Sequence, residues 1–169
     1  MQNIAIGQPV PSLTLPDLQG RLHILSDYLG QIVILNFWSA TCPHSERVDR
    51  SLLHFLSEWG KRVAVLWIAC EASEPVSSLS AIARQRGLPV VLHDAEQIAV
   101  QRFGAQVTPH LFVIDASGIL RYRGAFDDVS LSRREPSRCY LKEAVEALLG
   151  GSAPNPAEIS PFGCVITRQ

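Results

Sequence analysis

The sequence has 169 residues, of which 47% are apolar and 18% charged, with a formal net charge of −1. This length suits one domain with a well-buried core, and the composition is that of an ordinary globular protein. The charge provides no basic stripe, so we expect no nucleic-acid partner, and the chain lacks the 18 or more consecutive apolar residues of a membrane span.

The N-terminal residues 1–7 lack a basic segment followed by an apolar stretch, so no export signal is predicted. We expect a cytoplasmic protein as the sequence stands, and a periplasmic or exported one if a signal peptide has been trimmed. The cysteines, at 42, 70, 139 and 164, have no paired C-x-x-C spacing. This argues against a structural zinc site and a dense disulfide framework, but allows one catalytic thiol with a distant partner.

Extended and helical segments alternate along the chain, which is the pattern of an α/β fold. Residues 10–20 predict a short strand and a turn, and residues 21–25 predict the second strand of an N-terminal hairpin. Residues 31–38 are β-branched and nearly all apolar, as in a strand buried on both faces of a sheet.

A helix is predicted from 45 to 59, because Val48, Leu52 and Leu56 recur at a spacing of four. Pro43 suits the first turn of this helix, and Gly60 ends it. The later elements are predicted as a strand at 62–70, a helix at 75–86, a strand at 88–92, a helix at 96–103, strands at 111–114 and 119–122 joined by the turn 115–118, and a helix at 137–149.

Residues 150–169 begin as a Gly-, Pro- and Ser-rich segment that suggests a linker with no core of its own. The tail then becomes apolar at residues 162–166, and we expect this end to dock on the domain. We therefore divide the chain into a domain at 1–150 and a tail at 151–169 that carries Cys164.

Cys42 stands where the strand at 31–38 leads into the predicted helix. A helix N-terminus presents unpaired N–H groups and the positive end of the helix dipole, and both favour a thiolate over a thiol. Since the thiolate is the reactive form, Cys42 is a candidate nucleophile, and a protonated His44 would lower its pKa further. The alternative is that Cys42 is a small buried apolar residue. The strand end, Pro43 and His44 together favour the functional role.

The segment from Asn36 to Ser45 (NFWSATCPHS) resembles the active-site segment of the thioredoxin superfamily, especially its TlpA/ResA-like branch among the AhpC/TSA redoxins. Val107-Thr108-Pro109-His110 resembles the loop of that family whose proline is cis and faces the active-site cysteine. Tyr122-Arg123-Gly124 lies where the family has its last strand and turn. The resemblance covers roughly residues 7–150 and implies a thioredoxin-like α/β fold, with a central mixed β-sheet flanked by helices.

Two positions depart from the family pattern. The usual second active-site cysteine is Ser45 here, and the tryptophan that usually precedes the first cysteine is Thr41. A C-x-x-S site cannot form the local disulfide. Ser45 is either natural or an engineered substitution, and the equally unusual Thr41 favours a natural site.

Cys164 is the candidate for a distal resolving cysteine. Some small redoxin-domain proteins end in a Gly-Cys-x-Ile tail similar to the one here, and a flexible Pro-rich lead-in would let Cys164 reach Cys42 and exchange through a mixed disulfide. The alternative is a tail cysteine that only packs. Cys139 is expected to be structural, and Cys70 is expected to belong to the core, although its place at a strand end near the site keeps a role there open.

A thiol peroxidase is the main rival enzyme, and a redox-inactive thioredoxin-like binding module is the rival of another class. Peroxiredoxins resemble P-x-x-x-T-x-x-C, whereas Leu35 and Ser39 occupy the corresponding positions here. They also typically lack a proline at the position of Pro109, and both points favour disulfide exchange. A copper site of Cys42 and His110 is rejected, because one thiol and one imidazole make a poor metal site.

We therefore predict a thiol–disulfide oxidoreductase that needs no cofactor and no metal. Its expected partners are a disulfide-containing protein or a low-molecular-weight thiol, with an external thiol as reductant. The predicted catalytic residues are Cys42, His44, Ser45 (a hydrogen bond to the thiolate), Pro109 (the shape of the substrate groove) and Cys164. The predicted substrate-binding residues are Trp38, Thr41, Pro43 and Thr108.

Overall fold

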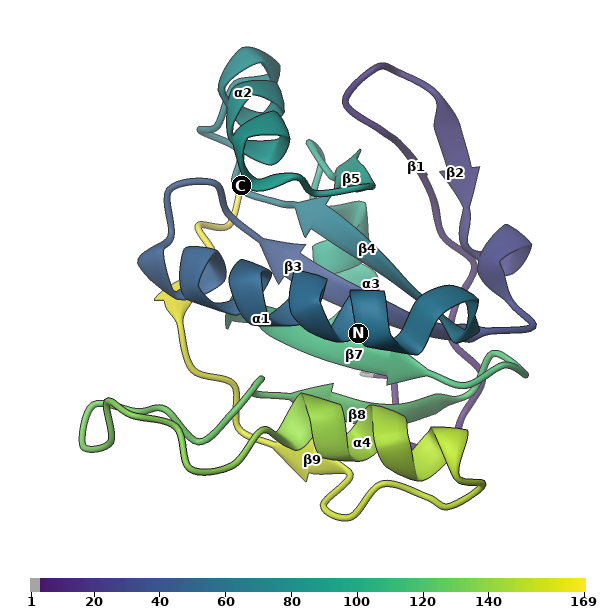
Figure 1. Cartoon of the computed structure of the whole chain (residues 1–169). Helices are drawn as coiled ribbons and strands as arrows, with labels where there is room; N and C mark the ends of the chain where they lie inside the picture. The colour runs from purple at the N-terminus through teal and green to yellow at the C-terminus, as the bar shows by residue number, and fades with distance from the viewer. Residues whose placement is uncertain (1–3) are drawn as a thin grey trace.

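The computed structural model describes residues 4–169 and is built around a mixed β-sheet (Figure 1). Within these residues the sheet has six strands in the order β5-β4-β3-β7-β8-β9. Strand β3 pairs parallel with β4 and antiparallel with β7. The strands are β3 (Ile32–Trp38), β4 (Val63–Ala69), β5 (Val91–His93), β7 (His110–Ile114), β8 (Leu120–Gly124) and β9 (Glu158–Ile159).

Helices cover both faces of the sheet. They are α1 (Pro43–Trp59), α2 (Val76–Arg86), α3 (Ile98–Phe103) and α4 (Tyr140–Leu149). Figure 1 shows α1 and α4 in front of the sheet and α3 behind it. Side chains alternate along β3, so Ile34 and Trp38 join the core under α1 and α4, whereas Leu35 and Phe37 join the core that includes α3. The predicted thioredoxin-like arrangement, with a buried strand leading to a helix, is confirmed.

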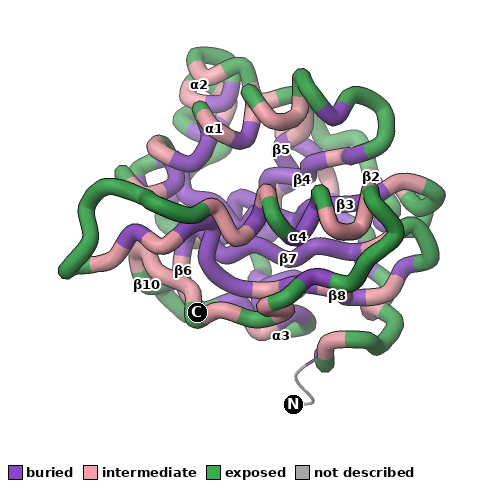
Figure 2. The backbone as a smooth tube through the Cα atoms, turned by 60° about the horizontal axis from the view of Figure 1, so that its bottom comes forward, coloured by how far each residue is buried: buried purple, intermediate pink, exposed green. Residues whose placement is uncertain are grey.

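The central strands form the interior of the molecule. Figure 2 shows buried backbone along β3, β4 and β7 and exposed backbone in the surrounding loops. The predicted N-terminal hairpin is also present, since β1 (Thr14–Pro16) pairs antiparallel with β2 (Leu22–Ile24). Among the described residues, no helix is long and apolar enough to cross a membrane.

Three of the displaced boundaries have local causes in backbone conformation or hydrogen bonding. Helix α4 begins at Tyr140 rather than at 137, because Ser137 donates its backbone N–H and its hydroxyl to the Asp128 carboxylate. Helix α3 begins at Ile98 rather than at 96, because Gln97 has a left-handed φ of 55°. Strand β5 begins at Val91 rather than at 88. The chain before it still wraps the end of α2, where the Leu88 N–H donates to the Ala83 carbonyl at 3.0 Å.

The tail at 151–169 contributes to the sheet, so it is more than a linker. Strand β9 pairs parallel with β8, which is therefore not the last strand of the sheet, contrary to the expectation for Tyr122–Gly124. Strand β10 (Cys164–Val165) pairs antiparallel with β6 (Val107–Thr108), and Ile166 is buried. The predicted docking of the apolar end of the tail is confirmed.

Candidate active site

Cys42 is the N-cap residue of α1, at the carboxyl end of β3. Its backbone is extended (φ −79°, ψ 119°), Pro43 opens the helix, and the Glu46 N–H donates to the Cys42 carbonyl at 3.1 Å. The thiol lies at the positive end of a 17-residue helix, where a thiolate is favoured. Only 3% of the Cys42 surface is exposed.

The loop before β7 lies against this thiol. Cys42 Sγ donates to the Thr108 carbonyl oxygen at 3.1 Å, and the Thr108–Pro109 peptide bond is cis. The predicted cis proline beside the active-site cysteine is therefore present.

The tail brings Cys164 to Cys42. In the β10–β6 ladder Cys164 is the partner of Thr108, and its side chain lies close enough to Cys42 to lower the pKa of that thiol. Gly163 permits this approach, because a Cβ at this position would clash with the Thr108 carbonyl oxygen. One residue earlier, the Phe162 ring packs edge-on against the His44 ring, with centroids 4.9 Å apart. Figure 2 shows β10 beside β6 near the C-terminus.

The pKa values of the two thiols are shifted in opposite directions. Burial works against the Cys42 thiolate, but hydrogen bonds from the Cys164 side chain, the Thr108 side chain and the Ser45 backbone N–H outweigh it, and the pKa of Cys42 lies below that of an ordinary thiol. Burial, the hydrogen bond to Cys42 and the charges of Cys42 and Glu71 raise the pKa of Cys164 to about 12. Of the two thiols, Cys42 therefore loses its proton at the lower pH.

The Thr108 hydroxyl is a buried polar group beside Cys42. It has no hydrogen-bond partner among the described residues. Its proximity to the Cys42 sulfur contributes to the lowered pKa of Cys42. The unpaired hydroxyl thus favours the thiolate over the thiol.

Ser45, at the position of the usual second cysteine, lies beneath Cys42 and is fully buried. Its backbone N–H contributes to the lowered pKa of Cys42, while its hydroxyl accepts from the Ser39 N–H at 3.4 Å. The Ser45 contribution to the thiolate therefore comes from the main chain, and its side chain holds the preceding loop.

Glu74 holds the loop of residues 39–41 through hydrogen bonds. Sequence analysis missed this residue. Its buried carboxylate accepts hydrogen bonds from the Ser39 hydroxyl (2.7 Å), the Thr41 hydroxyl (3.0 Å), the Thr41 N–H (3.0 Å) and the Ala40 N–H (3.3 Å). Glu74 follows β4, whose carboxyl end lies beside that of β3, and an acidic residue at this position is a signal that could have been used.

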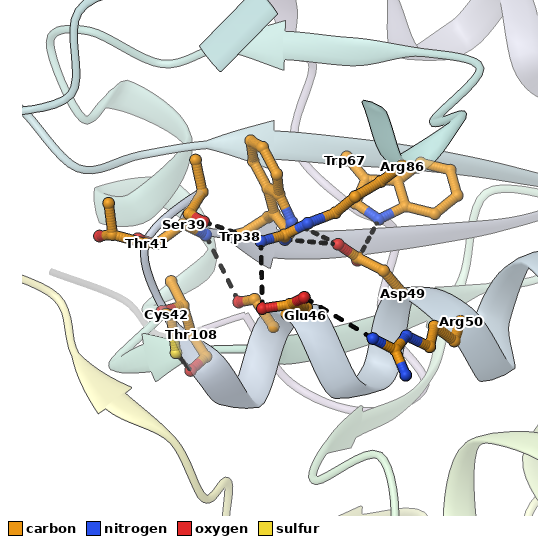
Figure 3. A network of polar contacts seen from close by, with 12 residues as sticks. Trp38, Ser39, Thr41, Cys42, Glu46, Asp49, Arg50, Trp67, Arg86 and Thr108 are labelled. Atoms are coloured by element: carbon orange, nitrogen blue, oxygen red, sulfur yellow. Dashed lines mark hydrogen bonds and ion pairs between the residues drawn. The ribbon is translucent and has the colours of Figure 1, made fainter. Parts of the chain in front are cut away.

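A second network holds the other side of the loop (Figure 3). The buried Asp49 carboxylate accepts from Trp38 Nε1 (2.9 Å), Trp67 Nε1 (2.8 Å) and Arg86 Nη1 (3.0 Å), and Arg86 Nη2 donates to the Ala40 carbonyl at 2.9 Å. Burial raises the pKa of Asp49, although these donors oppose the rise. Sequence analysis missed Asp49 and Arg86, because only the fold brings them to the two indoles.

The remaining predicted site residues lie in different environments. Thr41 and Pro43 are exposed at the start of α1, and His44 is half-buried against the tail. Trp38 is completely buried with its indole bonded to Asp49, which places it in the core and away from any open surface.

The other two thiols, of Cys70 and Cys139, are held in their protonated, less reactive form. Burial raises the pKa of Cys70 far above its ordinary value and that of Cys139 to about 11. Both thiols donate to main-chain carbonyls, that of Trp38 from Cys70 and that of Phe126 from Cys139. They are structural residues, as the sequence suggested.

Within residues 4–169, no three His, Cys, Asp or Glu side chains gather in a way that would hold a metal ion. His110 is buried against Phe112, and its Nδ1 accepts from the Gln106 N–H at 3.2 Å. Burial and the charge of Arg123 lower the pKa of His110 to about 4, so its ring is neutral.

Comparison with known proteins identifies the family. A sequence profile described as the AhpC/TSA family matches residues 6–123. The chain belongs to the AhpC/TSA family. This agrees with the resemblance carried by the active-site segment and the cis-proline loop.

Two relatives are named for thiol–disulfide chemistry. The chain is 32% identical over 117 residues to the thiol-disulfide oxidoreductase ResA of Geobacillus thermodenitrificans, a match that covers 68% of the chain and 66% of that protein. It is 31% identical over 131 residues to the thiol:disulfide interchange protein DsbE of Escherichia coli K12, covering 75% and 69%. The chain thus spans about two thirds of the length of these relatives.

Similarity to solved structures extends over nearly the whole chain. A hypothetical protein from Sinorhizobium meliloti 1021 superposes with a TM-score of 0.88 at 26% identity, and the match covers 99% of this chain and 97% of that one. Other solved thioredoxin-like proteins share the sheet and its flanking helices. The similarity to the Sinorhizobium protein therefore extends over the tail that carries Cys164.

Proposed function

We propose that this chain is a thiol–disulfide oxidoreductase in which Cys42 and Cys164 form the redox pair. The observation that carries the proposal is the β10–β6 ladder, which holds the Cys164 thiol against the Cys42 thiol at the start of α1. The names of the Geobacillus and Escherichia relatives support the same chemistry. A distal partner compensates for the serine at position 45.

The pair would cycle between a dithiol and a disulfide. In the reduced form, two thiols give two electrons and two protons to a partner disulfide, which becomes two thiols, and a bond forms between the two protein sulfurs. In the reverse direction, two external thiols reduce that bond. Cys42 supplies the thiolate because the start of α1, Ser45 and Thr108 stabilise its charge.

The site supports the peroxidase alternative less well. Ser39 occupies the position of the peroxiredoxin threonine, but its hydroxyl donates to Glu74 at 2.7 Å and lies within 3.3 Å of the Thr41 hydroxyl. Leu35, at the position of the peroxiredoxin proline, is fully buried. The Ser39 hydroxyl is therefore engaged in hydrogen bonds within the loop and is not free to hold a peroxide. A purely binding module would not need the lowered pKa of Cys42.

Peptide mapping by mass spectrometry tests the proposal. The protein is oxidised mildly, alkylated and digested, and a Cys42–Cys164 link is expected. Turnover of a low-molecular-weight disulfide is expected to be lost in Cys42→Ser and Cys164→Ser and kept in the matched control Cys139→Ser. If Cys42 resists both oxidation and alkylation in the folded protein, the proposal is wrong. Rapid consumption of peroxide without disulfide turnover would support the peroxidase instead.

The partner follows from the same chemistry. We propose a disulfide-containing protein or a low-molecular-weight disulfide as oxidant and an external thiol as reductant. The cytoplasmic compartment stays a prediction. The redox potential of the Cys42–Cys164 pair tests it, since a strongly reducing value fits the cytoplasm.

A further inference from the structure

The tail covers Cys42 and leaves Cys164 nearer the solvent. Cys42 is 3% exposed, and Phe162 and Gly163 pack on His44 and the Thr108 carbonyl beside it. Cys164 itself is only partly buried, and the next residue of the tail is 78% exposed. Of the two redox thiols, the outer one is therefore on the tail.

This cover is built into the fold, because residues on the C-terminal side of Cys164 are held as well. The buried Ile166 donates its N–H to the Gln106 carbonyl at 3.1 Å. Thr167 donates its N–H to Glu71 at 3.0 Å and accepts from the Gln97 side-chain amide at 2.7 Å. Gln97 is itself buried and has the unusual φ of 55°. With β9 anchored before Cys164, the tail is fixed on both sides.

The tail also occupies the edge at which an extended partner would pair. A peptide that adds to a sheet does so through the free backbone groups of an edge strand. The edge of β6 beside Cys42 is already paired with β10, with Cys164 opposite Thr108 and Val165 opposite Val107. While the tail is in place, an extended polypeptide therefore cannot pair with this edge of β6 beside Cys42.

We infer that the external thiol that reduces the oxidised pair attacks the sulfur of Cys164 and never meets Cys42 directly. The inference rests on the proposed function. Attack on a disulfide proceeds along the line of the S–S bond, from the side opposite the sulfur that leaves. Since Cys42 is 3% exposed and Cys164 is only partly buried, a thiol from solvent reaches the Cys164 sulfur first. The chemistry points to a low-molecular-weight thiol as the reductant.

The electrons balance in two steps. The external thiolate bonds to Cys164 Sγ, the Cys42–Cys164 bond breaks, and its electron pair leaves on Cys42 as a thiolate. A second external thiolate then attacks the first external sulfur, forms an external disulfide and releases the Cys164 thiolate, which takes a proton from water. The order suits the two acidities, because the thiol with the lower pKa is the better leaving group.

The test uses the oxidised full chain and glutathione as the small thiol. Limiting glutathione is added, the reaction is quenched in acid within its first turnover, free thiols are alkylated, and the peptides are mapped. We expect glutathione on Cys164 in at least about tenfold excess over Cys42, with Cys42 alkylated. Glutathione mainly on Cys42, in protein that carried the Cys42–Cys164 link, would overturn the inference alone. If no link forms on oxidation, the proposed function fails, and the inference fails with it.

A glycine variant tests the role of the cover. In Gly163→Ala the new Cβ clashes with the Thr108 carbonyl, which displaces the tail while both cysteines are kept, and only protein shown by mapping to carry the Cys42–Cys164 link is assayed. The share of glutathione on Cys42 is expected to rise severalfold in this variant. The matched control is Gly150→Ala, whose Cβ meets its nearest atom at an ordinary 3.5 Å, and it should keep the wild-type distribution. An unchanged distribution in Gly163→Ala would show that the tail does not select Cys164.

Discussion

The Glu74 carboxylate accepts both the backbone N–H and the hydroxyl of Thr41, each at 3.0 Å, directly before the reactive cysteine. Two further donors, the Ser39 hydroxyl and the Ala40 N–H, point at the same carboxylate. One acidic side chain from the loop between β4 and α2 therefore sets the conformation of the loop that ends at Cys42.

Replacing this carboxylate is expected to destabilise the protein. In Glu74→Gln the amide NH₂ faces hydrogen-bond donors that it cannot satisfy, and buried donors are left unpaired. The free energy of unfolding should fall by about 1–3 kcal/mol, measured by urea denaturation. Glu135→Gln, on an exposed residue, is the matched control and should change little. Equal stability of the two variants would exclude a structural role for Glu74.

The Thr108 hydroxyl is expected to control the acidity of Cys42. Thr108→Val keeps the size of the side chain and removes the donor that stabilises the thiolate, so the pKa of Cys42 should rise. The rate of Cys42 alkylation at neutral pH should then fall about tenfold, and its midpoint should move to higher pH. Thr14→Val, at an exposed position on β1, should leave the pH profile unchanged. A profile identical to the wild type in Thr108→Val would contradict this role.

Arg86 is expected to stabilise the protein because its planar guanidinium can donate two hydrogen bonds at once. It donates to Asp49 and to the Ala40 carbonyl at once, and its guanidinium lies 5.8 Å from the centre of the Trp38 ring. A lysine cannot make both bonds, so Arg86→Lys should lower the free energy of unfolding by about 1–2 kcal/mol. The control, Arg84→Lys, changes an exposed arginine of the same helix and should have no measurable effect.

His110 is expected to make stability fall in mild acid. Its pKa is about 4 in the folded protein, because of burial and Arg123, against 6.5 in the unfolded chain. As the pH falls from 6.5 towards 4, the unfolded chain takes up a proton that the folded protein does not. This stability is thus present above pH 6.5 and is lost through that window, by roughly 3 kcal/mol.

The free energy of unfolding, measured across that window, should fall less steeply in His110→Gln than in the wild type. Glutamine can still accept the Gln106 N–H, but it does not titrate. Parallel curves for the two proteins would assign the acid sensitivity to other groups.

The path from β3 through Cys42 into α1 could be predicted from local signals. The apolar β-branched run, Pro43 and Gly60 follow one another along the sequence, and each favours its structure independently of the rest of the fold. The turn at 115–118 could also be predicted, because its contacts are local. Asp115 accepts from two nearby N–H groups, those of Ser117 and Ile119.

The sequence left undecided whether Cys164 contacts Cys42, because that contact depends on a ladder of only two residues in each strand. Strands as short as β6 and β10 have no periodicity to detect, and their pairing is a long-range event. Glu74, Asp49 and Arg86 were missed for a related reason. A polar side chain shows its role through its partners, and theirs come from other elements.

For Trp38 the sequence suggested a role in the site that the fold does not support. Its place beside the active-site cysteine in the sequence suggested contact with substrate, but alternation along β3 turns its side chain under α1, where Asp49 binds the indole.

The position of Cys164 near the C-terminus has a thermodynamic consequence. A covalent bond to Cys42 would close a loop of about 120 residues, which contains α1, most of the sheet and α4. Closing a loop of this length removes conformational entropy from the unfolded chain worth about 4–5 kcal/mol. The oxidised protein should therefore melt several degrees above the reduced one, and a melting curve would report the oxidation state of the pair without any chemical label.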